Sequence, residues 1–442
     1  MKNNYRKSKL SSVITTLVVA PFVASTALAQ TSMLEEVVVT ATKSATSAQD
    51  IPIAITSIDG GILNDLGIYD SVDLPKVAPG LKVRWMGAFP SFKMRGGGVA
   101  GLNGSAVPLY TNGMAGGNAW AGWLDVERVE VLRGPQGTLY GSNTLGGMVN
   151  IVSKKPSTEK TDYGVAVTMG DYGARKFEGF VNMPISDSIA VRITGSDTER
   201  DPLIENENKQ FSEGGLRDED NSYIRAQVSW APTEAMGINV EYTNWETDSM
   251  GNANFGSHYV GLPINPETGR SSGWFSDNIV PRKAPIDGDV TTGGRTYHNA
   301  DPTTDPTGYR TTRGNFANTW QYESESLSLE FNWDLDFADL TIKARSSEST
   351  NLSLWDVDAL GGGDLADGVV SMSASDKIDM FISSNGDDAL RWTLGYYWAD
   401  SWDEDENNSA YVWAYTQADG SMKYPAWTTW DSGGSKSSAI YA

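Results

Sequence analysis

The chain has 442 residues, a formal net charge of −22 and no cysteine. The negative charge argues against nucleic acid as a partner, because nucleic-acid binding needs basic stripes. Without disulfides, an exported chain of this length has to be stabilised by a large core or by a closed, hydrogen-bonded barrel.

Export is predicted by residues 1–29. An apolar run over residues 13–23 follows a basic stretch, and the small residues Ala27 and Ala29 mark a cleavage site. The run is too short for a spanning helix, which needs about 20 residues. We interpret residues 1–29 as a cleaved signal peptide, with an uncleaved anchor as the alternative.

Residues 30–50 form a short N-terminal segment, and residues 51–160 are expected to form a small α+β domain. Short helices are expected over residues 61–66 and 71–76, the second with Ser71 as its N-cap. Glycine-rich turns separate the expected strands, which cover residues 81–85, 92–95, 108–110, 126–133 and 147–153.

Residues 161–442 alternate between apolar and polar side chains with period two, which predicts about ten β-strands. Short connections (185–188, 231–237, 335–339 and 384–388) alternate with long ones (197–221, 250–322, 346–375 and 403–436). Together with 46 glycines, 15 tryptophans and 18 tyrosines, this pattern is typical of an outer-membrane barrel. A soluble β-sandwich is the alternative, although it rarely has a loop as long as 250–322.

Several stretches carry a resemblance to one family. VERVEVLRGPQGTLYGSNTLGGMVNIVSKKP, residues 126–156, resembles the plug-domain signature of TonB-dependent outer-membrane receptors. LEEVVVTA at 34–41 resembles a TonB box, and QDIPIAITSIDG at 49–60 resembles the opening strand of the plug. FKMRGGG at 92–98 and PLYTNGM at 108–114 resemble central plug elements, with Asn112 in place of the usual aspartate. Residues 161–442 resemble the family by pattern.

The resemblance implies an α+β plug domain followed by an antiparallel transmembrane β-barrel of the siderophore-receptor kind. Plugged transporters of the outer membrane have 22 strands. About 10 are predicted here, so we expect the chain to be truncated at its C-terminal end.

The resemblance implies that TonB binds Glu36, Val37, Val38, Val39, Thr40 and Ala41. An extended segment with free backbone groups can add to the edge of a partner's sheet, and β-branched residues suit that extended form. No second strand is predicted nearby for it to pair with, and residues 42–50 have the composition of a flexible tether. The alternative is that residues 37–40 are simply the first strand of the plug.

Arg95 and Arg133 resemble plug arginines that, in the family, pair with carboxylates of the barrel wall. Buried charges need such partners. Period-two alternation turns Asp379 and Glu330 toward the lumen, which makes them the candidate carboxylates. The alternative places both arginines in exposed surface turns.

The resemblance also implies a ligand site between the plug apex and the long outer loops. Four aromatic residues are candidates for stacking on a ligand, or alternatively for the plug core: Trp85, Phe89, Trp120 and Trp123. Tight plug turns are expected at Gly96, Gly134, Gly137, Gly141 and Gly147. A G-x-G-x-x-G match that begins at Gly96 lacks a following helix, so nucleotide binding is rejected.

No catalytic constellation is recognisable, so the chain is not expected to be an enzyme. With two histidines and no cysteine, neither a cofactor nor direct binding of a bare transition metal is expected. The stretch DSWDEDEN at 400–407 is either a calcium-binding loop or a solvated acidic loop tip.

We therefore expect a receptor in the outer membrane of a Gram-negative bacterium that imports a scarce ligand. The resemblance favours an iron–siderophore complex. Its partners would be TonB with ExbB and ExbD, outer-membrane lipid and lipopolysaccharide, and the chain would be a monomer. The alternatives are an importer of oligosaccharide, vitamin B12 or another large nutrient, a passive binding protein, and a truncated remnant that does not transport.

Overall fold

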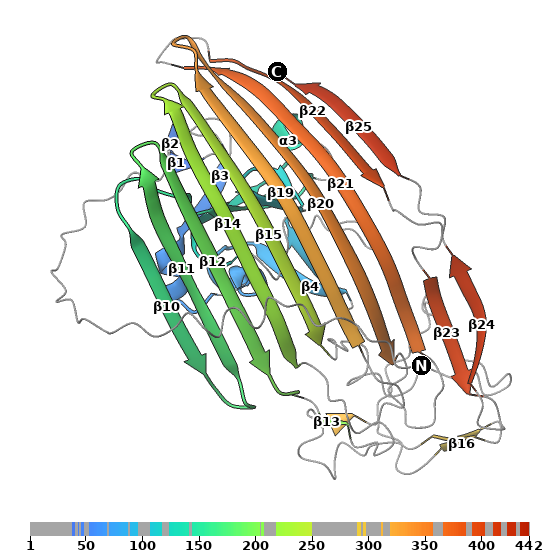
Figure 1. Cartoon of the computed structure of the whole chain (residues 1–442). Coiled ribbons are helices and arrows are strands. Elements are labelled where there is room, and N and C mark those ends of the chain that lie inside the picture. The colour runs from blue at the N-terminus through green and yellow to red at the C-terminus, as the bar shows by residue number, and fades with distance from the viewer. Residues whose placement is uncertain are drawn as a thin grey trace. The chain divides into compact units, whose positions relative to one another are not determined.

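The computed structural model describes a large part of the sequence that follows the predicted signal peptide (Figure 1). The described residues are 38–39, 43, 46–47, 53–68, 70–86, 89–95, 107–116, 123–140, 144–203, 205–206, 218–249, 290–292, 295–297, 311–312, 319–356, 366–385, 391–402, 410–416, 422–429 and 434–441. The predicted signal peptide, residues 1–29, lies outside them.

The plug domain is built on a five-stranded sheet with the order β3-β8-β9-β6-β7. These strands are β3 (Ala54–Asp59), β6 (Leu109–Thr111), β7 (Met114–Ala115), β8 (Val126–Arg133) and β9 (Gly147–Ser153). A separate hairpin consists of β4 (Leu81–Met86) and β5 (Phe89–Met94). The strands predicted for this domain are thus confirmed, with β6 and β9 pairing in parallel.

Short helices complete the plug: α2 (Gly60–Asp65), the 3-10 helix η1 (Leu74–Lys76) and α3 (Gly137–Tyr140). The predicted N-cap Ser71 is wrong. Helix η1 begins three residues later, and the carboxylate of Asp70 accepts the N–H groups of Val72 and Asp73 at 2.8 and 3.2 Å. Asp70 therefore supplies the local hydrogen bonds that were expected from Ser71.

The plug core is formed by apolar side chains from β8 and β9 that pack on the two N-terminal helices. Val129 and Val131 of β8 are fully buried, as is Leu74 of η1. Removing such side chains from water is the main favourable contribution to folding of a domain of this size, at about 25 cal/mol per Å² of apolar surface.

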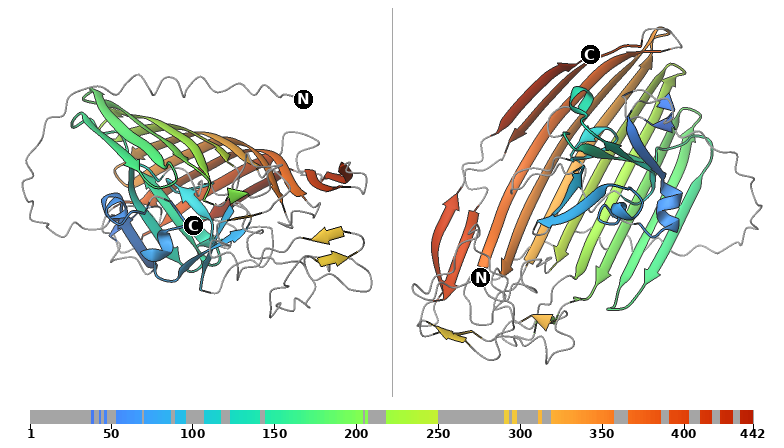
Figure 2. Two further views of the ribbon diagram at one scale, coloured as in Figure 1. Left: turned by 90° about the horizontal axis from the view of Figure 1, so that it is seen from below. Right: turned by 180° about the vertical axis from the view of Figure 1, so that it is seen from behind.

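Ten strands form one continuous antiparallel path, which Figure 2 shows side by side from two further directions. They are β10 (Asp162–Met169), β11 (Arg175–Ser186), β12 (Ile189–Arg200), β14 (Glu219–Thr233), β15 (Met236–Ser249), β19 (Thr319–Asp334), β20 (Ala338–Asp356), β21 (Ala366–Ser384), β22 (Thr393–Trp402) and β25 (Ser435–Tyr441). The prediction of about ten alternating strands is confirmed.

Shorter strands lie beside this path or apart from it. β23 (Ala410–Thr416) pairs with β21 and with β24 (Met422–Thr429). Three two-stranded pairs are separate: β1 (Val38–Val39) with β2 (Thr46–Ser47), β13 (Glu205–Asn206) with β18 (Thr311–Thr312), and β16 (Val290–Thr292) with β17 (Arg295–Tyr297).

The register of the long strands sorts their side chains onto two faces. One row across the outer face is apolar: Val191, Val228, Val240, Leu329, Ala344, Ile378 and Trp398. The adjacent row on the inner face is polar: Arg192, Gln227, Glu241, Ser328, Arg345 and Lys377. An apolar outside and a polar inside are what a membrane-spanning barrel needs.

Two of the glycines predicted in plug turns occupy backbone conformations that disfavour other residues. Gly134 has φ +105° and Gly147 has φ +134°. A Cβ atom on Gly147 would lie 2.1 Å from the carbonyl oxygen of Leu132. Gly137 instead begins α3, where a Cβ would meet nothing within 4 Å. Gly96 and Gly141 lie outside the described residues.

We predict that Gly147→Ala lowers the free energy of unfolding of the plug by at least about 1–3 kcal/mol, the usual cost of a strained backbone. Gly137→Ala is the matched control, and it should be neutral or slightly stabilising because alanine favours helix. Urea denaturation followed by tryptophan fluorescence tests both. Equal denaturation midpoints for Gly147→Ala and the parent protein would contradict the prediction.

Candidate functional site

The N-terminal segment contains a strand pair that the sequence did not predict. β1 and β2 pair antiparallel, with Val38 opposite Ser47 and Val39 opposite Thr46. The connection between them contains Lys43, whose φ is +61°. The segment expected to stand alone therefore pairs within its own chain, through two residues on each side. Glu36, Val37, Thr40 and Ala41 lie outside the described residues.

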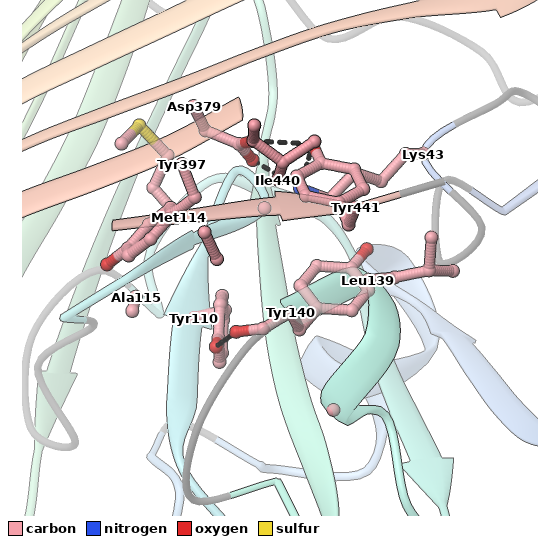
Figure 3. Close-up of a pocket in the computed structure, with 13 residues that line it drawn as sticks. Lys43, Tyr110, Met114, Ala115, Leu139, Tyr140, Asp379, Tyr397, Ile440 and Tyr441 are labelled. Atoms are coloured by element: carbon pink, nitrogen blue, oxygen red, sulfur yellow. Dashed lines mark hydrogen bonds and ion pairs between the residues drawn. The ribbon is translucent and has the colours of Figure 1, made fainter. Parts of the chain in front are cut away.

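Lys43 is bound by the inner wall of the barrel, as Figure 3 shows. Its Nζ lies 2.5 Å from Oδ2 of Asp379 and donates to the hydroxyl of Tyr441 at 2.8 Å. The Tyr441 hydroxyl donates in turn to Oδ1 of Asp379 at 2.7 Å. Both charged side chains are only 5% exposed. Asp379 thus faces the lumen as predicted, with Lys43 as its cation.

Three aromatic rings surround the same ammonium group. Its Nζ lies 4.4 Å from the ring centroid of Tyr441, 5.1 Å from that of Phe381 and 5.4 Å from that of Tyr140. Burial lowers the pKa of Lys43, and the neighbouring Asp379 carboxylate opposes that shift. The carboxylate and the rings together offset the loss of water around the cation.

A cavity of about 310 Å³ adjoins this cluster between the plug and the wall (Figure 3). Its lining includes Tyr110 and Met114 of the plug and Tyr397 of β22. The Tyr110 hydroxyl donates to the carbonyl of Tyr140 at 2.7 Å, and burial raises the pKa of Tyr110, so this phenol stays a donor.

A second cluster fixes the plug at the start of β8. The carboxylate of Asp125 receives two hydrogen bonds from Arg192, at 2.5 and 2.6 Å, and one from Thr194 at 2.9 Å. Arg225 donates to the backbone carbonyl of Asp125 at 2.7 Å. Arg192 and Arg225 are almost fully buried, and Arg192 also lies over the ring of Phe180. This cluster is the most completely buried charge pairing between plug and wall among the described residues.

A third cluster holds the turn between β6 and β7. Lys343 donates to the carbonyl of Asn112 at 2.7 Å, Arg345 to that of Thr111 at 3.3 Å and Lys377 to that of Ala115 at 3.2 Å. Three wall cations therefore bind backbone carbonyls of one plug turn.

Asn112 makes contacts that the usual aspartate could not make. Its side-chain amide donates to both carboxylate oxygens of Glu241 at 3.3 Å and to Ser153 at 3.2 Å, while its side-chain oxygen accepts the N–H of Ser153 at 2.9 Å. Glu241 is itself buried and accepts from Gln227. An aspartate here would place a second carboxylate against Glu241.

Glu330 faces inward as predicted and pairs with Lys155, just after the last plug strand, at 2.6 Å. Arg133 donates to Thr56 within the plug at 2.5 Å. Arg95 is exposed, with φ +50°, and its guanidinium lies beside Gly134. The structure thus gives Asp379 and Glu330 lysine partners and places both arginines in contacts within the plug.

Of the predicted ligand aromatics, Trp123 is 6% exposed and belongs to the plug core, which supports the packing alternative. Trp85 and Phe89 lie on the β4–β5 hairpin, where Trp85 pairs with Pro90 and Met86 with Phe89. Trp120 and most of the acidic stretch 400–407 lie outside the described residues. Across the residues that the structure does describe, no group of three or more metal-ligating side chains occurs.

Sequence reasoning missed Lys43 and Asp125. Lys43 is the single cation of the predicted tether over residues 42–50, and this isolated charge is a weak indication of a specific partner. Asp125 offered none, because its role depends on a positive φ of 54° and on arginines 67 and 100 residues away.

Within the described part of the protein, no helix has the length and apolar character needed to cross a membrane. The ten long strands have an apolar outer face, and a separate domain is bonded to their polar inner face by buried charges. The strands and the domain bonded to them define the architecture of a plugged outer-membrane barrel.

Comparison with known proteins finds similarity in the plug. Residues 47–148 match the model of the TonB-dependent receptor plug domain. The pesticin receptor of Yersinia pestis is 39% identical over 143 residues, which are 30% of this chain and 21% of that receptor. The iron-regulated outer membrane virulence protein of Vibrio cholerae is 31% identical over 185 residues, 38% of this chain and 28% of that protein.

The fold agrees over most of the chain. The crystal structure of the ferric yersiniabactin uptake receptor from Yersinia pestis superimposes with a TM-score of 0.61 and 17% identity, over 88% of this chain and 61% of that receptor. The plug of this chain matches the plug domain of TonB-dependent receptors, and its strands have the fold of these receptors. The chain is a protein of the Gram-negative outer membrane, and the Yersinia pestis and Pseudomonas aeruginosa relatives are named as receptors, not as enzymes. Its matched part spans 21% and 28% of the length of the Y. pestis and V. cholerae relatives.

We predict that Asp125→Ala destabilises the attachment of the plug by about 3–5 kcal/mol, because it leaves two buried arginines without their carboxylate. Limited proteolysis of the plug across a urea series, in outer-membrane preparations, measures the change. Asp187→Ala, at an exposed turn, is the control for loss of one carboxylate. An Asp125→Ala plug as resistant as the Asp187→Ala plug would contradict the prediction.

Proposed function

We propose that this protein is an importer that takes up a ferric siderophore across the outer membrane and is energised by TonB. The observation that carries the proposal is a short strand, β1, placed directly ahead of a plug that the wall holds by separate buried contacts. β1 pairs with β2 on one edge, and its other edge can pair with the sheet edge of a periplasmic partner. In this proposal the partner is TonB, acting with ExbB and ExbD on residues 36–41.

The ligand class is supported by the names of relatives. The V. cholerae relative is named as iron-regulated, the superimposed Y. pestis structure is a ferric yersiniabactin uptake receptor, and a further relative is a ferripyoverdine receptor. We propose that the ligand contacts the apical plug segments around Trp85, Phe89 and Trp120. The metal would enter as cargo inside its organic chelate, so the protein needs no metal ligands of its own.

The proposed transport sequence follows from the contacts. Import involves no covalent step, and the work lies in moving a plug whose charges are buried against the wall. When one of these pairings breaks, its charged groups lose their partners. Water must then enter the lumen to solvate them. A pull through the backbone of the N-terminal segment supplies that work. Outer-membrane lipid and lipopolysaccharide would cover the apolar outer rows of a monomer.

We predict that Val38→Pro abolishes uptake of ⁵⁵Fe-labelled ferric yersiniabactin and leaves its binding at 4 °C unchanged. Proline removes the backbone N–H of Val38 and prevents ladder pairing on that edge. Cells that lack other receptors for this siderophore and express the receptor provide the assay, and Val38→Ile is the control that keeps a β-branched residue. Unimpaired uptake by Val38→Pro would refute energy coupling through β1.

A further inference from the structure

We propose that Lys43 is a latch between the energy-coupling strand and the barrel wall, so that a pull on β1 is borne by the wall until Lys43 leaves Asp379. The inference rests on the proposed function, because it concerns how a pull on β1 reaches the plug. In this role Lys43 holds the N-terminal segment in place, and the barrel wall is what binds it.

The latch has a complete binding site for one ammonium group. Asp379 supplies the counter-charge at 2.5 Å, the Tyr441 hydroxyl accepts a hydrogen bond at 2.8 Å, and the Tyr441 ring lies 4.4 Å from the nitrogen. Figure 3 shows Lys43 reaching Asp379 and Tyr441 together. Because both charged side chains are 5% exposed, separating them strands a buried charge on the wall.

The order of elements along the sequence makes the latch the first element to bear a load. β1 ends at Val39, Lys43 follows in the connection to β2, and the first strand of the plug sheet starts at Ala54, beyond β2. Asp379 lies on β21, which is hydrogen-bonded along much of its length to β20 and β22. A strand held on both sides does not follow the pull, so tension from β1 passes through Lys43 into the wall and bypasses the plug.

Release of the latch also changes how far β1 can reach. With Lys43 bound, the four residue steps from Lys43 to Val39 span at most about 14 Å. Once Lys43 is free and β1 has separated from β2, the fifteen steps from Ala54 to Val39 span at most about 50 Å. The latch therefore sets two quantities. One is the force that must act on β1 before the plug is pulled. The other is the distance from the wall at which a partner can bind β1.

The natural absence of cysteine permits a direct test. Ala41→Cys introduces a single thiol between β1 and Lys43, and its rate of reaction with a maleimide reports exposure of this connection. The full receptor is used in outer-membrane vesicles, without ligand and without TonB. Asp379→Asn breaks the ion pair and leaves the residues around the thiol unchanged, while Lys43→Met breaks it and leaves the wall unchanged.

We expect both variants to raise the labelling rate at least about fivefold, the lower end of typical coupling between two sites. Lys76→Met is the matched control, because it removes an exposed lysine of the plug that is 65% accessible, and it should leave the rate unchanged. Rates within twofold of the parent in both latch variants would overturn the proposal, as would an equal rise in Lys76→Met. Heat-modifiable migration on a gel verifies that each barrel has folded.

The two proposals fail separately. Labelling is measured without TonB, so a fivefold rise stands even if Val38→Pro leaves uptake intact, and energy coupling through β1 stands even if labelling does not change.

Discussion

The structure depends on the pairing of charges that are buried between plug and wall. Arg192 and Arg225 project from adjacent wall strands into a space from which water is nearly excluded, and there they require an anion. Asp125 supplies this anion. The two wall arginines therefore fix the position at which β8 begins, and the carboxylate of Asp125 neutralises their charge. Neither part has a satisfied surface without the other.

The contacts run in both directions. Wall lysines and arginines donate to the carboxylate of Asp125 and to plug backbone carbonyls at Thr111, Asn112 and Ala115. Lys43, Lys155 and the Asn112 amide donate the other way, to carboxylates of the wall. Asn112 and Asp125 both have positive φ, at 52° and 54°. Asparagine and aspartate tolerate this conformation better than most residues. Asn112 and Asp125 therefore each form a turn of the plug and also attach the plug to the wall.

The sequence predicted what depends on local pattern and missed what depends on distant partners. Strand parity placed Glu330 and Asp379 on the lumen face, because side-chain direction alternates with every residue. Their partners Lys155 and Lys43 lie 175 and 336 positions away, so no local pattern could supply them. Glu330 also has Lys343 at 3.5 Å, directly opposite it on the neighbouring strand, where a hairpin register brings it. Trp123 shows a different limit. In the sequence, a tryptophan fits a ligand-binding surface and a hydrophobic core equally well. Only its packing in the structure shows that it belongs to the core.

Asn112 is followed by Gly113, and asparagine is a thermolabile residue that can lose its side-chain amide. That chemistry needs the N–H nitrogen of Gly113 to attack the Asn112 side chain, and here the N–H is committed to Asn150 at 2.9 Å while the amide is held by Ser153 and Glu241. The fold of the plug itself therefore restrains a residue whose decay would set a new negative charge against Glu241, and the wall adds the contact from Glu241. The turn that anchors the plug is thus also held in a form that favours the chemical lifetime of the receptor.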